Sequence, residues 1–187
     1  MTRPALLILT GPPAAGKSRL IKELARRLDL PLVAKDTIKE ALMDVLPSDT
    51  VEASETLGRA AFAVLYSVAG SLLDAHVGAI LEAAFHREQA ERELAPLVER
   101  ADAAIVHISA PRQLIAQRYR ERADAGSRHP GHHDRERVEE LAEQLERGVY
   151  EPPELGIPVL RVDTSENRYR PDVDEIAGWC RQRLSHI

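Results

Sequence analysis

The sequence predicts an α/β fold in which a mainly parallel sheet of about five strands lies between helices, giving three layers. Two observations favour this class. Short apolar runs of strand length alternate along the chain with longer runs whose apolar residues recur every three or four positions, as in helices. In addition, the first apolar run leads directly into a glycine-bounded loop and then into a helical run. Strands separated by helices pair most simply in parallel, because a parallel connection needs a crossover of helical length.

Composition and length describe one globular domain over residues 1–187. The chain is 44% hydrophobic and 29% charged, and its net charge of −5 argues against a large polyanionic partner such as nucleic acid. The amino terminus has one arginine and a short apolar run that suits neither a signal peptide nor a membrane span, so we expect a cytoplasmic protein. Cys180 is the only cysteine, which excludes an internal disulfide and predicts a packed residue on the last helix.

Residues 11–18 match the phosphate-binding pattern G-x-x-x-x-G-K-[ST] and lie between the first strand and the first helix. Successive backbone N–H groups of such a loop curl around a phosphate, and the positive N-terminus of the next helix faces it. Lys17 then reaches the β- and γ-phosphates, and the Ser18 hydroxyl is a ligand for Mg²⁺. We therefore expect ATP and Mg²⁺ as cofactors. The expected nucleotide-binding residues of the loop are Gly11, Pro12, Pro13, Ala14, Ala15, Gly16, Lys17 and Ser18.

The next segments predict a helix over residues 19–28, a short strand over 32–34 and a helix over 38–46. Asp36 directly follows the strand. In an open α/β sheet, ligands collect beyond the carboxyl ends of the strands, so Asp36 is expected in the same crevice as the phosphate loop. There its carboxylate can accept a proton from a substrate hydroxyl that attacks the γ-phosphate. The alternative is that Asp36 is only the N-cap of the following helix.

Residues 51–75 predict one or two helices that form the acceptor-side wall of the crevice. The candidate acceptor contacts on this wall are Arg59, Tyr66 and His76. Residues 77–82 predict a buried strand that ends in Glu82. An acid at such a strand end often holds Mg²⁺ through water, so Glu82 is a candidate metal residue together with Ser18. A solvated charge at the strand end is the alternative.

A helix over 87–100 and a strand over 103–108 come next, followed by a segment rich in arginine. This arginine-rich segment, residues 112–137, holds seven arginines and four acids in a protein that is acidic overall. Arg118 and Arg122 lie one helical turn apart, and guanidinium groups pair well with phosphate oxygens. We therefore expect the segment to act as a lid over the triphosphate.

The expected tip of this lid, residues 126–134, is too rich in glycine and proline for a helix. Arg128 is a candidate nucleotide contact there, and a solvent-facing loop residue is the alternative. His129, His132 and His133 leave substrate, phosphate or metal binding open. Zinc is disfavoured, because no cysteine lies nearby and the spacing fits no tetrahedral pattern.

The chain ends with a predicted helix over 135–147, a strand over 157–162 and a helix over 172–184. Asp163 and Thr164 directly follow the strand, and the same strand-end argument predicts them on the nucleotide side of the crevice. The residues of the last helix that are expected to pack on the sheet are Ile176, Trp179 and Leu184.

With these residues located, the chain resembles the small P-loop kinases, the group that includes chloramphenicol phosphotransferase, the kinase domain of polynucleotide kinase and bacterial kinases labelled as AAA-family ATPases. The resemblance covers nearly the whole length and rests most specifically on residues 11–18, Asp36 and the pair Arg118 and Arg122. It implies that Asp36 is the general base toward the acceptor hydroxyl and that the two arginines stabilise the transferring phosphoryl group. Glu82 departs from the pattern, because relatives often have an aspartate at this strand end.

The leading hypothesis is therefore an ATP- and Mg²⁺-dependent phosphotransferase that acts on a hydroxyl group of a small polar molecule, such as a sugar, a nucleoside or an antibiotic. Its expected catalytic residues are Lys17, Asp36, Arg118 and Arg122. A 5′-hydroxyl polynucleotide kinase is one alternative, although aromatic residues make up only 4% of the chain and leave few stacking platforms. A non-catalytic ATP-binding module is another. The acceptor, the preference for ATP over GTP, the oligomeric state and the strand order stay open at this point.

Overall fold

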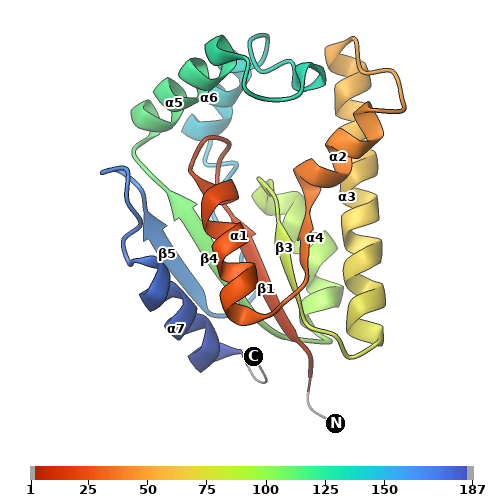
Figure 1. The fold of residues 1–187 in the computed structure, drawn as a ribbon, viewed down its shortest axis with the longest axis vertical. Helices are drawn as coiled ribbons and strands as arrows, with labels where there is room; N and C mark the ends of the chain where they lie inside the picture. Colours follow the sequence, from red (N-terminus) through yellow and green to blue (C-terminus); the bar gives the residue numbers. More distant parts are fainter. Residues whose placement is uncertain (1–2, 185–187) are drawn as a thin grey trace.

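A computed structural model describes residues 3–184 and contains a five-stranded sheet in the order β2-β3-β1-β4-β5 (Figure 1). All four strand pairs are parallel. The strands are β1 (Ala5–Thr10), β2 (Leu32–Ala34), β3 (Ala79–Glu82), β4 (Asp102–Ser109) and β5 (Val159–Asp163). The predicted α/β class with a parallel sheet is confirmed, and the structure supplies the strand order.

Helices cover both faces of this sheet, so the predicted three layers are confirmed (Figure 1). The helices are α1 (Lys17–Leu28), α2 (Lys35–Met43), α3 (Val51–Asp74), α4 (Arg87–Val98), α5 (Arg112–Ala125), the 3₁₀ turn η1 (Pro130–His132), α6 (Val138–Glu146) and α7 (Val173–Arg183). Side chains of β1 alternate between the two layers. Leu7 and Leu9 pack with α1, α5, α6 and α7, whereas Leu6 and Ile8 pack with α3 and α4.

The parallel direction of the strands gathers the sequence-predicted groups at one edge of the sheet. The phosphate loop follows β1, Asp36 follows β2, Glu82 ends β3, and Thr164 follows β5. In Figure 1 this edge faces the arginine-rich segment, which runs from α5 through η1 into α6 and reaches across toward α2 and α3.

Several predicted boundaries differ from the observed ones by a few residues. The segment 51–75 forms the single helix α3. The helix predicted from residue 38 begins at Lys35, and the helix predicted from residue 135 begins at Val138. Local sequence signals define the ends of helices only to within a few residues, because the terminal turns of a helix fray and are often irregular.

Helix α3 is the one described helix that is long and apolar enough, by length and composition alone, to cross a membrane. Its most apolar window has a mean hydropathy of 1.4 and is 28% buried within the protein. The buried residues recur every three or four positions from Ser54 to Leu73, which is the pattern of a helix that packs through one face. In the structure, α3 packs against α2, α4 and β3.

The phosphate loop approaches β4 so closely that only glycine fits at its start. Gly11 has φ +141°, and a Cβ at this position would lie 2.1 Å from the carbonyl oxygen of Ile108. Ala14 and Gly16 also have positive φ, which lets the chain turn tightly before α1 begins.

The substitution Gly11→Ala is therefore expected to lower the free energy of unfolding by about 3 kcal/mol, through steric overlap and backbone strain. Gly178→Ala is the matched control, because Gly178 lies inside α7 and a Cβ there has no neighbour within 4 Å. The free energy of unfolding of this control should rise by about 0.5–1 kcal/mol, because alanine has a higher helix propensity than glycine. Urea-induced unfolding measures both. Equal stability of Gly11→Ala and the parent would contradict the close approach.

Candidate active site

A cavity of about 1030 Å³ opens at the carboxyl edge of the sheet. Its wall runs from the phosphate loop across α2 to α3, and α5, the lid tip and α6 supply further lining. This volume is at the upper end of the range for small-molecule sites. The cavity therefore has room for a nucleotide triphosphate and part of a second small molecule.

The phosphate loop forms one end of the cavity through Gly16, Lys17 and Ser18. The Lys17 ammonium group is buried and donates hydrogen bonds to the carbonyl oxygens of Gly11 (2.8 Å) and Pro12 (2.9 Å). Burial lowers the pKa of Lys17, and the negative charge of Glu82 opposes this shift. Ser18 lies exposed in the first turn of α1 and lines the cavity.

The loop after β5 supports the phosphate loop from behind. The Thr164 hydroxyl is buried and donates to the carbonyl oxygen of Ala15 (3.1 Å), and the Tyr169 hydroxyl donates to that of Gly16 (2.9 Å). Asp163 lies outside the cavity lining, and its carboxylate accepts hydrogen bonds from Ser165. Thr164 therefore positions the loop, and Tyr169 is a supporting residue that sequence patterns did not indicate.

Arg118 lines the cavity from α5, but its guanidinium group is held by the same β5 loop. It donates to the hydroxyl (3.1 Å) and the carbonyl oxygen (2.7 Å) of Thr164 and to the side-chain oxygen of Asn167 (2.9 Å). These three hydrogen bonds connect α5 to the support of the phosphate loop.

Glu82 lies buried at the end of β3 and lines the cavity. Burial raises the pKa of its carboxyl group, and the positive charge of Lys17 opposes that shift. No hydrogen-bond donor to this carboxylate is found among residues 3–184. A buried carboxylate without donors, with the Ser18 hydroxyl on the same cavity, is an oxygen set that suits Mg²⁺. The residues present therefore fit the expected metal.

Asp36 is the second residue of α2, and Ala34 occupies the N-cap position, so the N-cap interpretation of Asp36 is wrong. Its half-exposed carboxylate faces the cavity and pairs with Lys35 (3.1 Å) and with Arg128 (2.5 Å). Burial would raise the pKa of Asp36, but the positive charges of Lys35 and Arg128 outweigh it and lower that pKa. Asp36 is therefore ionised at neutral pH.

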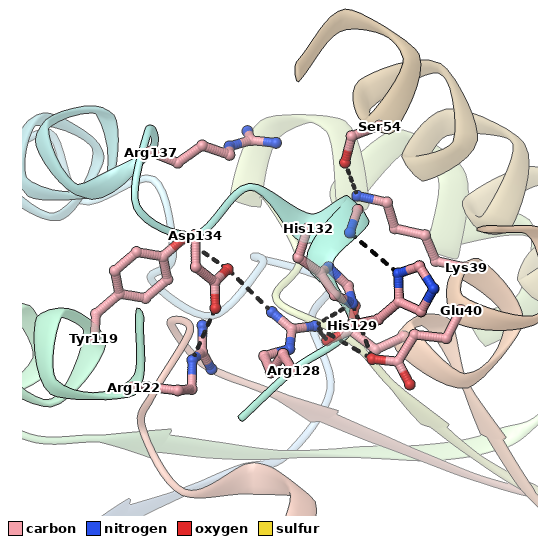
Figure 2. A network of polar contacts seen from close by, with 12 residues as sticks. Lys39, Glu40, Ser54, Tyr119, Arg122, Arg128, His129, His132, Asp134 and Arg137 are labelled. Carbon is pink, nitrogen blue, oxygen red and sulfur yellow. Dashed lines mark hydrogen bonds and ion pairs between the residues drawn. The ribbon is translucent and has the colours of Figure 1, made fainter. Parts of the chain in front are cut away.

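The arginine-rich segment is organised around Asp134, as Figure 2 shows. This carboxylate, with only 11% of the side chain exposed, pairs with Arg122 (3.2 Å) and Arg128 (3.4 Å) and accepts a hydrogen bond from Tyr119 (3.0 Å). Arg122 also stacks over the Tyr119 ring at 4.7 Å. Within residues 3–184, Nη2 of Arg122 has no hydrogen-bond partner. This nitrogen is buried, so a ligand in the cavity that Arg122 lines would reach it only after the side chain moves.

The lid tip rests on α2 and on the loop that follows it. Nε2 of the buried His132 lies 2.9 Å from both Arg128 and Glu40, and Nε2 of His133 lies 2.8 Å from the carbonyl oxygen of Ser48. His129 accepts a hydrogen bond from the backbone of Gly131 (3.1 Å). The three histidines thus have separate partners, and no metal-binding group of three or more His, Cys, Asp or Glu side chains occurs in the described part of the chain.

The structure also locates the remaining sequence-predicted residues. Arg59 and Tyr66 of α3 line the cavity, whereas His76 follows the far end of α3 and lies outside the lining. Arg128, expected at the nucleotide, contacts Asp36 on the acceptor side. Lys39, which was not indicated by the sequence, is buried and lines the cavity. The sequence feature that could have indicated Lys39 is its position one helical turn after Asp36, which places both residues on the same face of α2.

A family model named AAA_33 and described as an AAA domain matches residues 6–148. That range begins in β1 and extends just beyond α6, so it includes the phosphate loop, Asp36, Glu82 and the arginine-rich segment. A solved structure from Chloroflexus aurantiacus, described as that of a candidate kinase, is 33% identical over 98% of this chain and 100% of its own, with a TM-score of 0.84. No curated protein matches the chain significantly.

Two further solved structures share the fold at lower sequence identity. A gluconokinase from Sinorhizobium meliloti is 16% identical over 99% of this chain and 94% of its own, with a TM-score of 0.58. A chain of the Pnkp1/Rnl/Hen1 RNA repair complex is 21% identical over 83% of this chain and 50% of its own, with a TM-score of 0.54. At these identities the similarity concerns the fold alone.

The docked lid tip is expected to loosen in acid. Burial and the positive charge of Arg128 lower the pKa of His132 from an ordinary value near 6.5 to about 3, so the docked imidazole is neutral. An undocked imidazole gains a proton as the pH falls below about 6.5. The stability that the neutral ring contributes is therefore present above this pH and is lost as the pH falls toward 3.

Hydrogen exchange of the backbone amides of His129 and of residues 131–133 tests this prediction at pH 7.5 and pH 5.0, after correction for intrinsic exchange rates. We expect faster exchange at pH 5.0 in the parent and a much smaller change in His132→Gln. The His76→Gln variant is the control, because His76 lies outside the cavity lining, and it should behave like the parent. A pH response that is unchanged in His132→Gln would assign the loosening to other groups.

Proposed function

This chain belongs to the AAA_33 family of AAA domains, and from that premise we propose that it is an ATP- and Mg²⁺-dependent phosphotransferase acting on a hydroxyl group of a small polar molecule. The fold is that of the P-loop kinases. The single observation that carries the proposal is that Lys17 of the phosphate loop and the carboxylate of Asp36 line one cavity. A phosphoryl donor and a group that orients an acceptor hydroxyl are thereby brought together.

The nucleotide would bind at the phosphate loop, where the N-terminus of α1 and the backbone N–H groups favour phosphate. Lys17 would exchange the carbonyl oxygens of Gly11 and Pro12 for β- and γ-phosphate oxygens. Ser18 and Glu82 would hold Mg²⁺, which neutralises charge on the phosphates when it is bound. We propose Arg122 as the first lid contact to the transferring group, because it lines the cavity and its buried Nη2 atom has no hydrogen-bond partner among residues 3–184 to lose when the side chain turns toward a phosphate.

Arg118 is proposed as a second phosphate contact. Its guanidinium group lines the cavity, and binding would require exchange of the hydrogen bonds to Thr164 and Asn167 for bonds to phosphate oxygens. Charge-assisted hydrogen bonds to phosphate are stronger than bonds between a guanidinium and neutral oxygens, so this exchange is favourable.

On the acceptor side, Asp36 is proposed to accept a hydrogen bond from the attacking hydroxyl group. The hydroxyl oxygen forms a bond to the γ-phosphorus, the bond from this phosphorus to the bridging oxygen breaks, ADP leaves, and the hydroxyl proton moves to Asp36. Arg128 must first move off Asp36, because it now occupies one carboxylate oxygen. Lys35, which stays paired with Asp36, still lowers the pKa of Asp36, so this carboxylate orients the hydroxyl and receives the proton late in the transfer.

The variant Asp36→Asn is expected to lower kcat by about 10²-fold or more, because the amide retains the shape but cannot take the proton. The affinity for ATP should stay within about threefold of the parent. Glu40→Gln is the matched control: it also removes a charge from α2 that contacts the lid tip, and it should retain most of kcat. Steady-state kinetics and ATP titration measure these values. Unchanged turnover of Asp36→Asn would end the assignment.

The function itself is tested by ADP release from Mg·ATP in the presence of sugars, sugar acids including gluconate, nucleosides, aminoglycosides, chloramphenicol-like alcohols and 5′-hydroxyl oligonucleotides. We expect stimulation by one class of small molecules, and its loss in Lys17→Met, which removes the ammonium group at nearly constant side-chain length. Stimulation by oligonucleotides would favour the polynucleotide kinase. Tight ATP binding without any stimulation would favour a non-catalytic binding module.

A further inference from the structure

Lys39 is a buried cation that the proposed reaction does not use. Only 3% of the residue is exposed, and its ammonium group donates one hydrogen bond, to the buried hydroxyl of Ser54 on α3 (2.8 Å; Figure 2). No carboxylate lies within ion-pair distance of Lys39 among residues 3–184. Taking an ammonium group out of water without an anion beside it is costly, and two of its three N–H groups remain available.

Apart from Glu82 at the end of β3, the acids that line the cavity are engaged by other side chains. Asp36 pairs with Lys35 and Arg128, Glu40 contacts His132, and both Glu55 and Glu140 pair with Arg137. Several acids therefore lie around the same cavity as Lys39, but among residues 3–184 none of them forms an ion pair with it. Burial, followed by the positive charges of Lys35, Arg137 and Arg128, lowers the pKa of Lys39 to about 8 against the opposing charge of Asp36.

The position of Lys39 places this cation on the acceptor side of the cavity. Lys39 follows Asp36 by three residues, so the two share a face of α2 with a rise of about 4.5 Å between them. Ser54 and Gly58 lie one turn apart on the facing side of α3. Gly58 lines the cavity without a side chain that would cover the ammonium group, and a Cβ there would lie 3.9 Å from Nζ.

The rest of this wall includes Arg59 and an aromatic surface. Among residues 3–184, the hydrogen-bond partner of Arg59 is the neutral hydroxyl of Thr56 at 2.9 Å. Phe62, Tyr66 and Phe85 pack with ring centroids 5.8–6.4 Å apart and line the same region. The wall thus combines positive charge at one place with a flat apolar surface beside it.

We propose that the phosphate acceptor is itself an anion, and that Lys39, held in place by Ser54, binds its carboxylate or phosphate group with Arg59 at the rim while Asp36 receives its hydroxyl. The inference rests on the proposed function and specifies its substrate class. The spacing on α2 selects molecules in which the hydroxyl and the anionic group are separated by only a few carbon atoms. An anion at this place compensates the buried charge that the protein leaves uncompensated.

Matched pairs of acceptors test the proposal through turnover. Gluconate and glycerate are compared with the neutral glucitol and glycerol, and glycerol 3-phosphate provides the phosphate arm. We expect kcat/KM for at least one anionic member to exceed that of its neutral counterpart by about 10²-fold, the scale of a buried charge-assisted hydrogen bond. Equal or better turnover of the neutral members would overturn the proposal while leaving the kinase function standing.

The variant Lys39→Met removes the charge and retains a similar length. It should raise KM for the anionic acceptor by about 10²-fold, leave KM for ATP unchanged and remove the preference over the neutral counterpart. Lys39→Arg should recover part of that preference. Thermal unfolding confirms that the variants are folded, and Lys39→Met should be at least as stable as the parent, because a buried uncompensated charge is removed. A preference that survives in Lys39→Met would contradict the assignment.

Direct titration of Lys39 separates this proposal from the kinase function. In protein with ¹³C-labelled lysine, the Cε resonance of Lys39, assigned by its loss in Lys39→Met, reports its pKa with and without glycerate, glycerol 3-phosphate or inorganic phosphate. We expect one of these anions to raise that pKa from about 8 to above about 9. Such a rise without any ADP release supports the anion site and contradicts the kinase. An unchanged pKa with all three anions would overturn the anion site.

Discussion

The common direction of the five strands is the constraint on which the site depends. Each strand ends at the same edge, so residues that are far apart in the sequence meet there without any long-range signal in the sequence itself. Alternate residues of β1 pack into the core layers on opposite faces of the sheet. A shift of β1 by one residue relative to its neighbouring strands would move each side chain to the opposite layer, so the packing fixes the register of the strands. The close contact between Gly11 and β4 then determines where the phosphate loop begins.

The cations of the cavity are held by oxygen atoms of the protein. Lys17 contacts two backbone carbonyls, Arg118 the β5 loop, and Arg128 the carboxylate of Asp36. A ligand that binds these cations would replace their present hydrogen-bond partners. Each replacement would contribute to the binding free energy only the difference between two similar interactions. Lys39 differs from these three in having a single partner, the neutral hydroxyl group of Ser54. Two of its three N–H groups are therefore without a protein partner among residues 3–184.

Much of the fold and part of the site could be predicted from local sequence, because the signals are local. The phosphate loop between an apolar run and a helix, Asp36 after a strand, and the parallel sheet all depend on neighbouring residues. Asp134 and Lys39 could not be assigned in this way. Their roles depend on which helices pack together, and a sequence pattern does not report the docking of the lid tip on α2. Sequence reasoning therefore placed Arg128 at the nucleotide, whereas packing places it at Asp36.

Asp134 gives Arg122 and Arg128 a resident anion within their own segment. In the proposed reaction, phosphate groups attract the guanidinium group of Arg122, and this carboxylate is the competitor that Arg122 leaves behind. After transfer, the same competition would act in reverse and favour release of the phosphorylated product, since Arg122 has an internal partner to return to. A competing internal anion of this kind would limit product inhibition at the expense of some affinity for the nucleotide.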